Sequence, residues 1–175
     1  MTKWILKCKN IVDESADVLV CSANVNLNPS GGVGAELLGR HGSKMQRALH
    51  AILAGRKRHF AEQGEVIAYS DTDLPYKVVL HAVAVNGFYE SSPPVVERIV
   101  RTALYLAQDN KARKVVLTAL ATGYGNLTLS QFADGIRPLL GENFDPVEQV
   151  CVCLLEDYRI QQLASALPAA EVVSK

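Results

Sequence analysis

The sequence lacks an excess of either charge and lacks long apolar runs. Eighteen Lys and Arg residues balance eighteen Asp and Glu residues in a chain of 175. No global field therefore attracts nucleic acid or anionic lipid. The N-terminal apolar run, residues 4–6, is too short for a signal peptide core, and no window reaches the length of a membrane span. These absences predict a cytoplasmic protein with no membrane partner and disfavour nucleic acid as a partner.

Cysteine and histidine are scarce, and their spacing does not fit a metal site. Cys151 and Cys153 share a face of an apolar strand, but no second pair or nearby histidine completes a ligand set. The histidines at 41, 50 and 59 are nine residues apart, half a turn out of phase on a helix. We therefore predict structural thiols, which include Cys8 and Cys21, with no metal and no cofactor.

The apolar residues that are present alternate between strand and helix patterns. Hydrophobic residues make up 49% of the chain, enough for a full core, so residues 1–175 are predicted to form a single domain. The strands are expected at residues 4–11, 17–21, 65–70, 76–85, 114–119 and 149–155. Helical periodicity occupies most of the intervening segments. This order predicts an α/β sandwich with a largely parallel sheet.

Polar residues mark the starts of several helices. Ser43 with Gln46 predicts a capping box for a helix ending near Gly64, and Thr128 with Gln131 predicts a second box. Asp157 is a candidate cap for the terminal helix.

Two glycine-rich loops follow buried strands of this predicted sheet. They are Asn28–Gly34, NPSGGVG, and Thr122–Asn126, TGYGN. In parallel sheets, ligands lie beyond the carboxyl ends of the strands, where loops present helix N-termini and main-chain N–H groups. A diphosphate between the two loops would accept several such hydrogen bonds. Tight turns without a ligand are the alternative interpretation.

Three segments in this order carry a family resemblance. Val18–Asn24, VLVCSAN, is followed by SGGVG; Val79–Val85 reads VLHAVAV; and Ala121–Asn126 reads ATGYGN. Together they resemble the macrodomains, a family that binds ADP-ribose. The likeness covers nearly the whole chain. It implies a three-layer α/β/α sandwich with a mixed, largely parallel central sheet of about six strands, and a ligand cleft at the carboxyl ends of those strands.

The resemblance also implies ligand-binding residues. Asn10 stands where the family has an aspartate that accepts the adenine amine, beside the main-chain N–H of Ile11, although it could equally be a solvated residue at a strand end. Asn24 aligns with the asparagine that reaches the distal ribose; its alternative role is to stabilise its own loop. Around the phosphates the implied residues are Ser30, Gly31, Gly32, Val33 and Gly34, and on the other side Thr122, Gly123, Tyr124, Gly125 and Asn126. Tyr158 is expected to flank adenine, or else is simply a first-turn aromatic residue.

No catalytic residue is assigned. Hydrolytic members follow their glycines with V-D-G, but here Val33 is followed by Gly34 and Ala35, so that aspartate is missing, and Cys21 replaces the first asparagine of the N-A-A-N motif. Glu36 is explained equally well by its place near a helix N-terminus, and His81 resembles a structural histidine of the family. The expected function is therefore binding of ADP-ribose, an ADP-ribosylated protein or O-acetyl-ADP-ribose. The alternatives are a hydrolase that removes ADP-ribose from proteins or deacylates O-acyl-ADP-ribose, and an interaction or RNA-binding domain without nucleotide binding.

Overall fold

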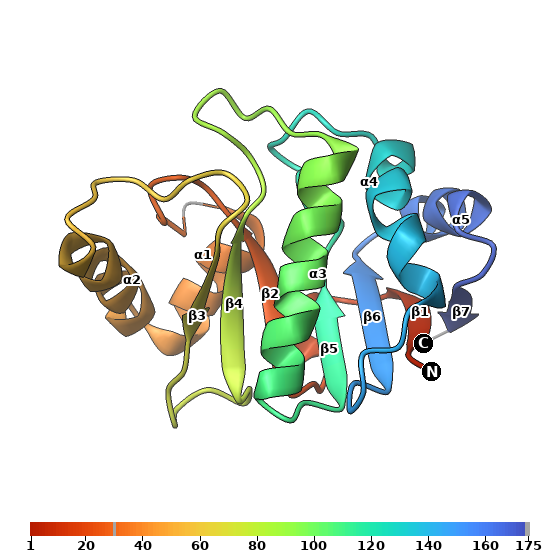
Figure 1. The fold of residues 1–175 in the computed structure, drawn as a ribbon, viewed down its shortest axis with the longest axis horizontal. Coiled ribbons are helices and arrows are strands. Elements are labelled where there is room, and N and C mark those ends of the chain that lie inside the picture. Colours follow the sequence, from red (N-terminus) through yellow and green to blue (C-terminus); the bar gives the residue numbers. More distant parts are fainter. Residues whose placement is uncertain (30, 174–175) are drawn as a thin grey trace.

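The computed structural model, which describes residues 1–29 and 31–173, has a seven-stranded sheet at its centre (Figure 1). Its strands are β1 (Lys3–Cys8), β2 (Val18–Ala23), β3 (Val66–Tyr69), β4 (Val78–Val83), β5 (Lys114–Leu117), β6 (Gln149–Leu154) and β7 (Glu171–Val173). The order across the sheet is β3-β4-β2-β5-β6-β1-β7, and only the β3–β4 pair is antiparallel. The mixed, largely parallel sheet is confirmed. The strand beyond the predicted six is β7, whose three residues are too few to give a periodic signal.

Helices cover both faces of this sheet. They are η1 (Ile11–Asp13), α1 (Gly32–His41), α2 (Lys44–Gly55), α3 (Pro93–Asp109), α4 (Leu129–Ile136), η2 (Arg137–Gly141) and α5 (Asp157–Ala166). Helices α3, α4 and α5 pack on one face, and η1, α1 and α2 pack on the other. Alternate residues of β2 serve the two cores: Val18 and Val20 face α3, whereas Leu19 and Cys21 face α1 and α2. This explains the continuous apolar run of β2 and confirms the three-layer α/β/α arrangement.

Helix α2 departs from its predicted bounds. It ends at Gly55 rather than near Gly64, because the chain turns at Lys57, whose φ of 54° is left-handed. The capping box predicted for Ser43 and Gln46 is wrong. Ser43 has φ −81° and ψ 3°, and its hydroxyl accepts no capping hydrogen bond. Gln46 donates instead to a side chain of the loop after β2.

The other predicted helix starts differ in outcome. At α4, the Thr128 side chain accepts from the Gln131 N–H and the Gln131 side chain accepts from the Thr128 N–H, so this capping box is confirmed. At α5, the N-cap is Glu156 rather than Asp157, which is the first helical residue. Both helices start immediately after loops that lie beyond the carboxyl ends of strands.

The strand order gathers several loops at one edge. Strands β4, β2, β5, β6 and β1 are consecutive neighbours and run parallel. Their carboxyl ends therefore meet at the same edge, where the two glycine loops follow β2 and β5. Among the helices of the described residues, none is long and apolar enough to cross a membrane.

Candidate functional site

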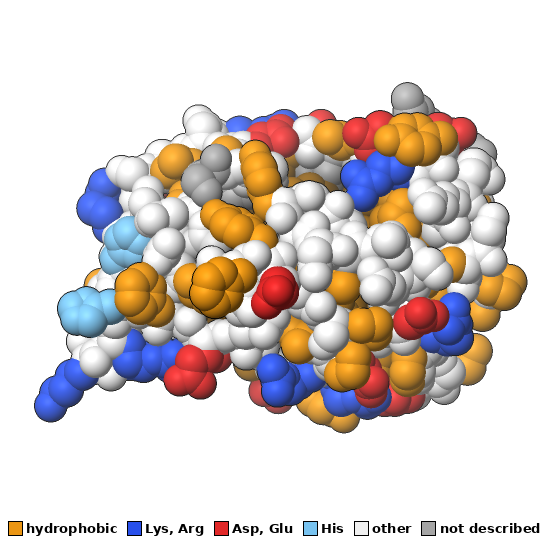
Figure 2. Space-filling model, turned by 90° about the horizontal axis from the view of Figure 1, so that it is seen from above, with side chains coloured by type: hydrophobic (Ala, Val, Ile, Leu, Met, Phe, Trp, Pro, Cys, Tyr) orange, Lys and Arg blue, Asp and Glu red, His pale blue; other side chains and the backbone are white. Residues whose placement is uncertain are grey.

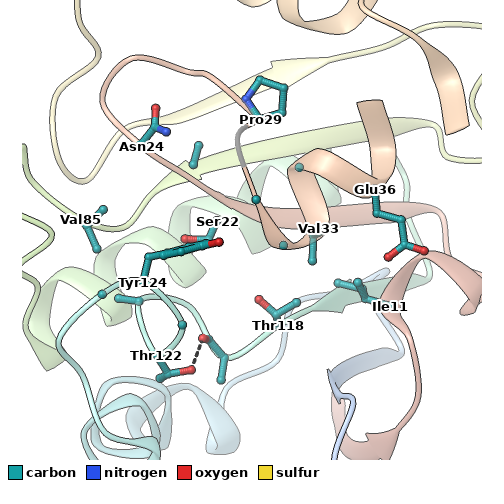
Figure 3. Close-up of a pocket in the computed structure, with 18 of the residues that line it drawn as sticks. Ile11, Ser22, Asn24, Pro29, Val33, Glu36, Val85, Thr118, Thr122 and Tyr124 are labelled. Atoms are coloured by element: carbon teal, nitrogen blue, oxygen red, sulfur yellow. Dashed lines mark hydrogen bonds between the residues drawn. The ribbon is translucent and has the colours of Figure 1, made fainter. Parts of the chain in front are cut away.

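A cavity of about 460 Å³ opens at this edge, where the segments following β1, β2, β4, β5 and β6 meet (Figure 3). Its volume is in the range of small-molecule sites. The predicted site residues that line it are Asn10, Ile11, Asn24, Gly31, Gly32, Val33, Gly34, Thr122, Gly123, Tyr124 and Gly125. The lining residues not assigned to the site from the sequence include Glu36, Tyr89, Thr118, Glu156 and Arg159. They lie on α1, after β4, after β5 and in the segment from β6 into α5, which only folding brings together.

Of the three remaining predicted residues, two do not line the cavity and one is not described. Ser30 lies outside the described residues. Asn126 does not line the cavity; its side chain accepts the Ser91 N–H at 2.9 Å and its own N–H bonds to the Tyr89 carbonyl. Tyr158 also does not line it, and the side chain is 70% exposed. The next residue, Arg159, reaches the cavity instead, because successive helical residues point in different directions.

The loop after β2 is fixed by its own asparagines and ends at a helix N-terminus. The Asn24 amide donates to the Asn28 carbonyl at 3.0 Å and accepts the Asn28 N–H at 3.2 Å, as expected if it stabilises the loop. Helix α1 then begins with Gly31 as N-cap, and Gly32 has the left-handed φ of 54°. The first-turn N–H groups of this ten-residue helix have no partner within the helix, which makes its start suited to an anion.

The loop after β5 has a tight internal geometry and one open position. Ala121 has φ 61°, and its carbonyl accepts the Leu127 N–H at 3.1 Å. A side chain on Gly125 would collide with that carbonyl, so the turn requires glycine there. By contrast, a Cβ on Gly123 would meet no atom within 4 Å. Gly123, which lines the cavity, therefore has open space around it.

Tyr124 joins the two glycine loops across the mouth of the cavity. Its ring lies so close to Gly31 that a Cβ there would be 2.7 Å from the ring and the hydroxyl. Even so, 76% of the Tyr124 side chain is exposed. Figure 3 shows the ring between the two loops, and Figure 2 shows hydrophobic side chains gathered on this upper face. Since Tyr89 also lines the cavity and is half-exposed, two tyrosines lie at its rim.

One cation lies beside the second loop. The Arg159 guanidinium donates to the Thr122 hydroxyl at 3.1 Å and lies 3.7 Å from the Glu156 carboxylate. Its side chain is 25% exposed, and it lines the cavity. The other lining cation, Lys9, is held by the buried Glu14 at 2.9 Å. Arg159 is therefore the lining cation that is positioned for an anion between the loops.

At the opposite end, the lining is apolar with hydrogen-bond acceptors. Ile11 is buried and forms part of the wall, with Glu36 beside it (Figure 3). The Asn10 side chain meets that of Glu36. The Asn10 amide nitrogen lies 2.8 and 3.0 Å from the two Glu36 oxygens, and its oxygen accepts the Val12 N–H at 3.3 Å. An apolar wall with a few polar groups is typical of a site for a planar heterocycle.

The buried imidazole of His81 lines the cavity and contacts a buried thiol that does not line it. The Cys21 Sγ lies 3.3 Å from the His81 Nδ1. Burial raises the pKa of Cys21 to about 12 and lowers the pKa of His81 to about 4, so both side chains are uncharged at neutral pH. A neutral thiol is a poor nucleophile. Over residues 1–29 and 31–173, no three His, Cys, Asp or Glu side chains gather in a group that could hold a metal ion.

These features define an α/β/α protein with a cleft at the carboxyl edge of its sheet, one end of which is suited to an anion. One end of the cleft has two glycine loops, a helix N-terminus and Arg159; the other has an apolar wall with acceptors. Residues 20–135 match the Macro domain family, and the chain belongs to it.

The most informative relatives are bacterial and human. The chain is 26% identical to a Streptomyces griseus macro domain-containing protein over 160 residues, which is 90% of each chain. It is 32% identical to a Streptomyces nogalater macro domain-containing protein, over 70% of this chain and 68% of that one. It is also 28% identical to human protein mono-ADP-ribosyltransferase PARP14, over 82% of this chain and 8% of that protein.

Solved structures show the same fold. A mutant of the Oceanobacillus iheyensis macrodomain with ADPR superimposes with a TM-score of 0.82 at 19% identity, covering 93% of this chain and 90% of that chain. The Trypanosoma brucei macrodomain in complex with ADP-ribose gives 0.76 at 21% identity, covering 93% and 68%.

Proposed function

We propose that this protein binds ADP-ribose, free or attached to another molecule, in the cleft described above. The observation that carries the proposal is the pair of glycine loops that face each other across the cavity, beside the N-terminus of α1 and the Arg159 guanidinium. Main-chain N–H groups and one cation suit a diphosphate, which carries two negative charges and many acceptor oxygens. Membership of the macro domain family and the ADP-ribose named in the titles of two similar structures support the same ligand.

The cavity suggests an orientation for the nucleotide. With the diphosphate between the loops, adenine fits the apolar end beside Ile11, where Asn10 offers an acceptor. The distal ribose then lies toward Asn24 and Tyr124, where the lining is polar and open. A protein or an acetyl group attached to the distal ribose would extend out of the cleft through this open side. The proposed ligands therefore include a mono-ADP-ribosylated protein and O-acetyl-ADP-ribose.

We propose a binding module rather than a hydrolase because the carboxylates of the cavity are already engaged. The acidic side chains of the described lining are Glu36 and Glu156. Glu36 accepts from Asn10 and Arg40, and Glu156 faces Arg159. A general base needs a carboxylate or imidazole within hydrogen-bond reach of the attacking water. Glu36 is held by two donors, Glu156 is paired with the cation assigned to the diphosphate, and burial lowers the pKa of His81 to about 4, which leaves a weak base.

Calorimetry with ADP-ribose, ADP and AMP tests the binding. Binding of ADP-ribose, with weaker binding as the distal ribose and phosphate are removed, supports the proposal. Incubation with a mono-ADP-ribosylated protein and with O-acetyl-ADP-ribose then separates binding from hydrolysis, because only a hydrolase changes these compounds. Turnover of either compound would replace the binding module with an enzyme. Absence of ADP-ribose binding would leave an interaction domain that has lost the nucleotide site.

A further inference from the structure

The Asn10 side chain is held at both ends of its amide. Its oxygen accepts the Val12 N–H at 3.3 Å, and its nitrogen lies 2.8 and 3.0 Å from the two Glu36 oxygens. A main-chain N–H can only donate and a carboxylate can only accept, so each neighbour independently requires the same orientation of the amide. The amide oxygen retains a second lone pair, and Asn10 and Glu36 both line the cavity.

Glu36 is itself fixed from outside the cavity. Arg40 donates to one Glu36 oxygen at 2.7 Å and to Asp13 at 2.9 Å. This chain of hydrogen bonds runs from Asp13 through Arg40 and Glu36 to Asn10. Donation from the Asn10 nitrogen to a carboxylate also polarises the amide, which strengthens its oxygen as an acceptor.

We propose that Glu36 is a positioning residue that makes this end of the cleft select a 6-aminopurine over a 6-oxopurine, an inference that rests on the proposed binding of ADP-ribose. The fixed groups here, the Asn10 oxygen and the Glu36 carboxylate, are acceptors. An exocyclic amine supplies the donor that they lack. A 6-oxo group would bring a lone pair against the Asn10 oxygen, and a buried acceptor left without a donor is costly.

The need for Glu36 follows from the asymmetry of an amide. Without that carboxylate, only the long 3.3 Å hydrogen bond from the Val12 N–H holds the amide, so Asn10 rotates more readily to present its nitrogen to a 6-oxo group and the preference is reduced. An aspartate at position 10 has two equivalent oxygens and needs no orienting partner. With Glu36 retained, however, Asn10→Asp places two carboxylates at about hydrogen-bond distance, where their repulsion disfavours ionisation of both at once. The informative variant is therefore the double change Asn10→Asp with Glu36→Ala.

The test measures the affinity of the full chain for ADP-ribose and for inosine diphosphate ribose, in which a 6-oxo group and an N1–H replace the 6-amine and the unprotonated N1 of adenine. The native chain should prefer ADP-ribose by about tenfold or more, as expected for one mismatched hydrogen bond. Glu36→Ala should reduce this ratio to about threefold or less, chiefly by gaining affinity for inosine diphosphate ribose. Asn10→Asp in the Glu36→Ala background should restore the preference.

Glu97→Ala is the matched control, because it removes the carboxylate of another i,i+4 glutamate–arginine pair, that with Arg101 on α3, and neither residue lines the cavity. Its affinity ratio should equal that of the native chain. An unchanged ratio in Glu36→Ala, or an equal loss of affinity for both ligands, would overturn the positioning role while leaving ADP-ribose binding intact. If the native chain binds neither nucleotide, the inference is overturned together with the proposed function.

Discussion

Gly123 gives a sharp test of the second loop, because the space around it is empty in the protein itself. A Cβ at this position would meet no atom within 4 Å, and the backbone is not in the left-handed region. Gly123→Val should therefore change the free energy of unfolding by less than about 1 kcal/mol. The buried Trp4, the single tryptophan, provides a fluorescence signal for unfolding in urea.

The same substitution should abolish nucleotide binding if the diphosphate occupies that space. The valine side chain would displace the phosphate from the main-chain N–H groups of the loop. Each charge-assisted hydrogen bond contributes about 1.5–3 kcal/mol, so losing two costs about 3–6 kcal/mol. This corresponds to a decrease in affinity of at least about a hundredfold, measured by calorimetry with ADP-ribose.

Gly39 offers a matched control. It lies on α1 outside the cavity, and a Cβ there also meets no atom within 4 Å. Gly39→Val should leave both unfolding and binding near their native values. If Gly123→Val is stable and binds ADP-ribose with native affinity, the second loop does not contact the phosphates, and the reasoning that places the diphosphate between the loops is refuted.

Three further predictions concern charge. Arg159→Gln should weaken ADP-ribose binding about tenfold and reduce the loss of affinity seen as salt is raised, since it removes the cation beside Thr122; calorimetry at two salt concentrations checks this, and an unaltered salt dependence would contradict it. Burial raises the pKa of Glu14, but hydrogen bonds from Lys114, Lys9 and Lys7 outweigh it and lower the pKa from 4.5 to about 2. These interactions contribute about 3 kcal/mol to the free energy of unfolding above pH 4.5, and the contribution is lost as the pH falls toward 2. Glu14→Gln should therefore lower the free energy of unfolding at pH 7 and reduce its dependence on pH below 4.5, as measured by urea titrations. Burial lowers the pKa of His81 from 6.5 to about 4, so stability should also decrease by about 3 kcal/mol as the pH falls from 6.5 toward 4, and His81→Gln should remove that step.

Much of the fold could be predicted from local patterns. The apolar runs of β2, β4 and β5 are continuous because both sheet faces are covered, and such unbroken runs can be recognised in the sequence. The Thr128 capping box is equally local, since donor and acceptor are three residues apart. The end of α2 and the edge strand β7 were missed, because a left-handed turn at Lys57 and a three-residue strand leave no periodic trace.

The site residues also divide into those that the local sequence indicates and those that only the tertiary structure places. The two glycine loops are contiguous stretches, so composition and family resemblance indicate them directly. Arg159 could not be chosen over its neighbour Tyr158, because which residue of a helix's first turn faces a cavity depends on how that helix is placed.

The sequence by itself determined the strand and helix alternation, the glycine loops and the family, because these depend on residues near one another in the chain. Tertiary structure decided which loops meet and what their side chains bond to. Asn10 and Glu36 are 26 residues apart, and their contact exists because β1 and α1 converge on one edge of the sheet. Hydrogen bonds between distant segments have no sequence period, and so the orientation of that amide is fixed only when the chain folds.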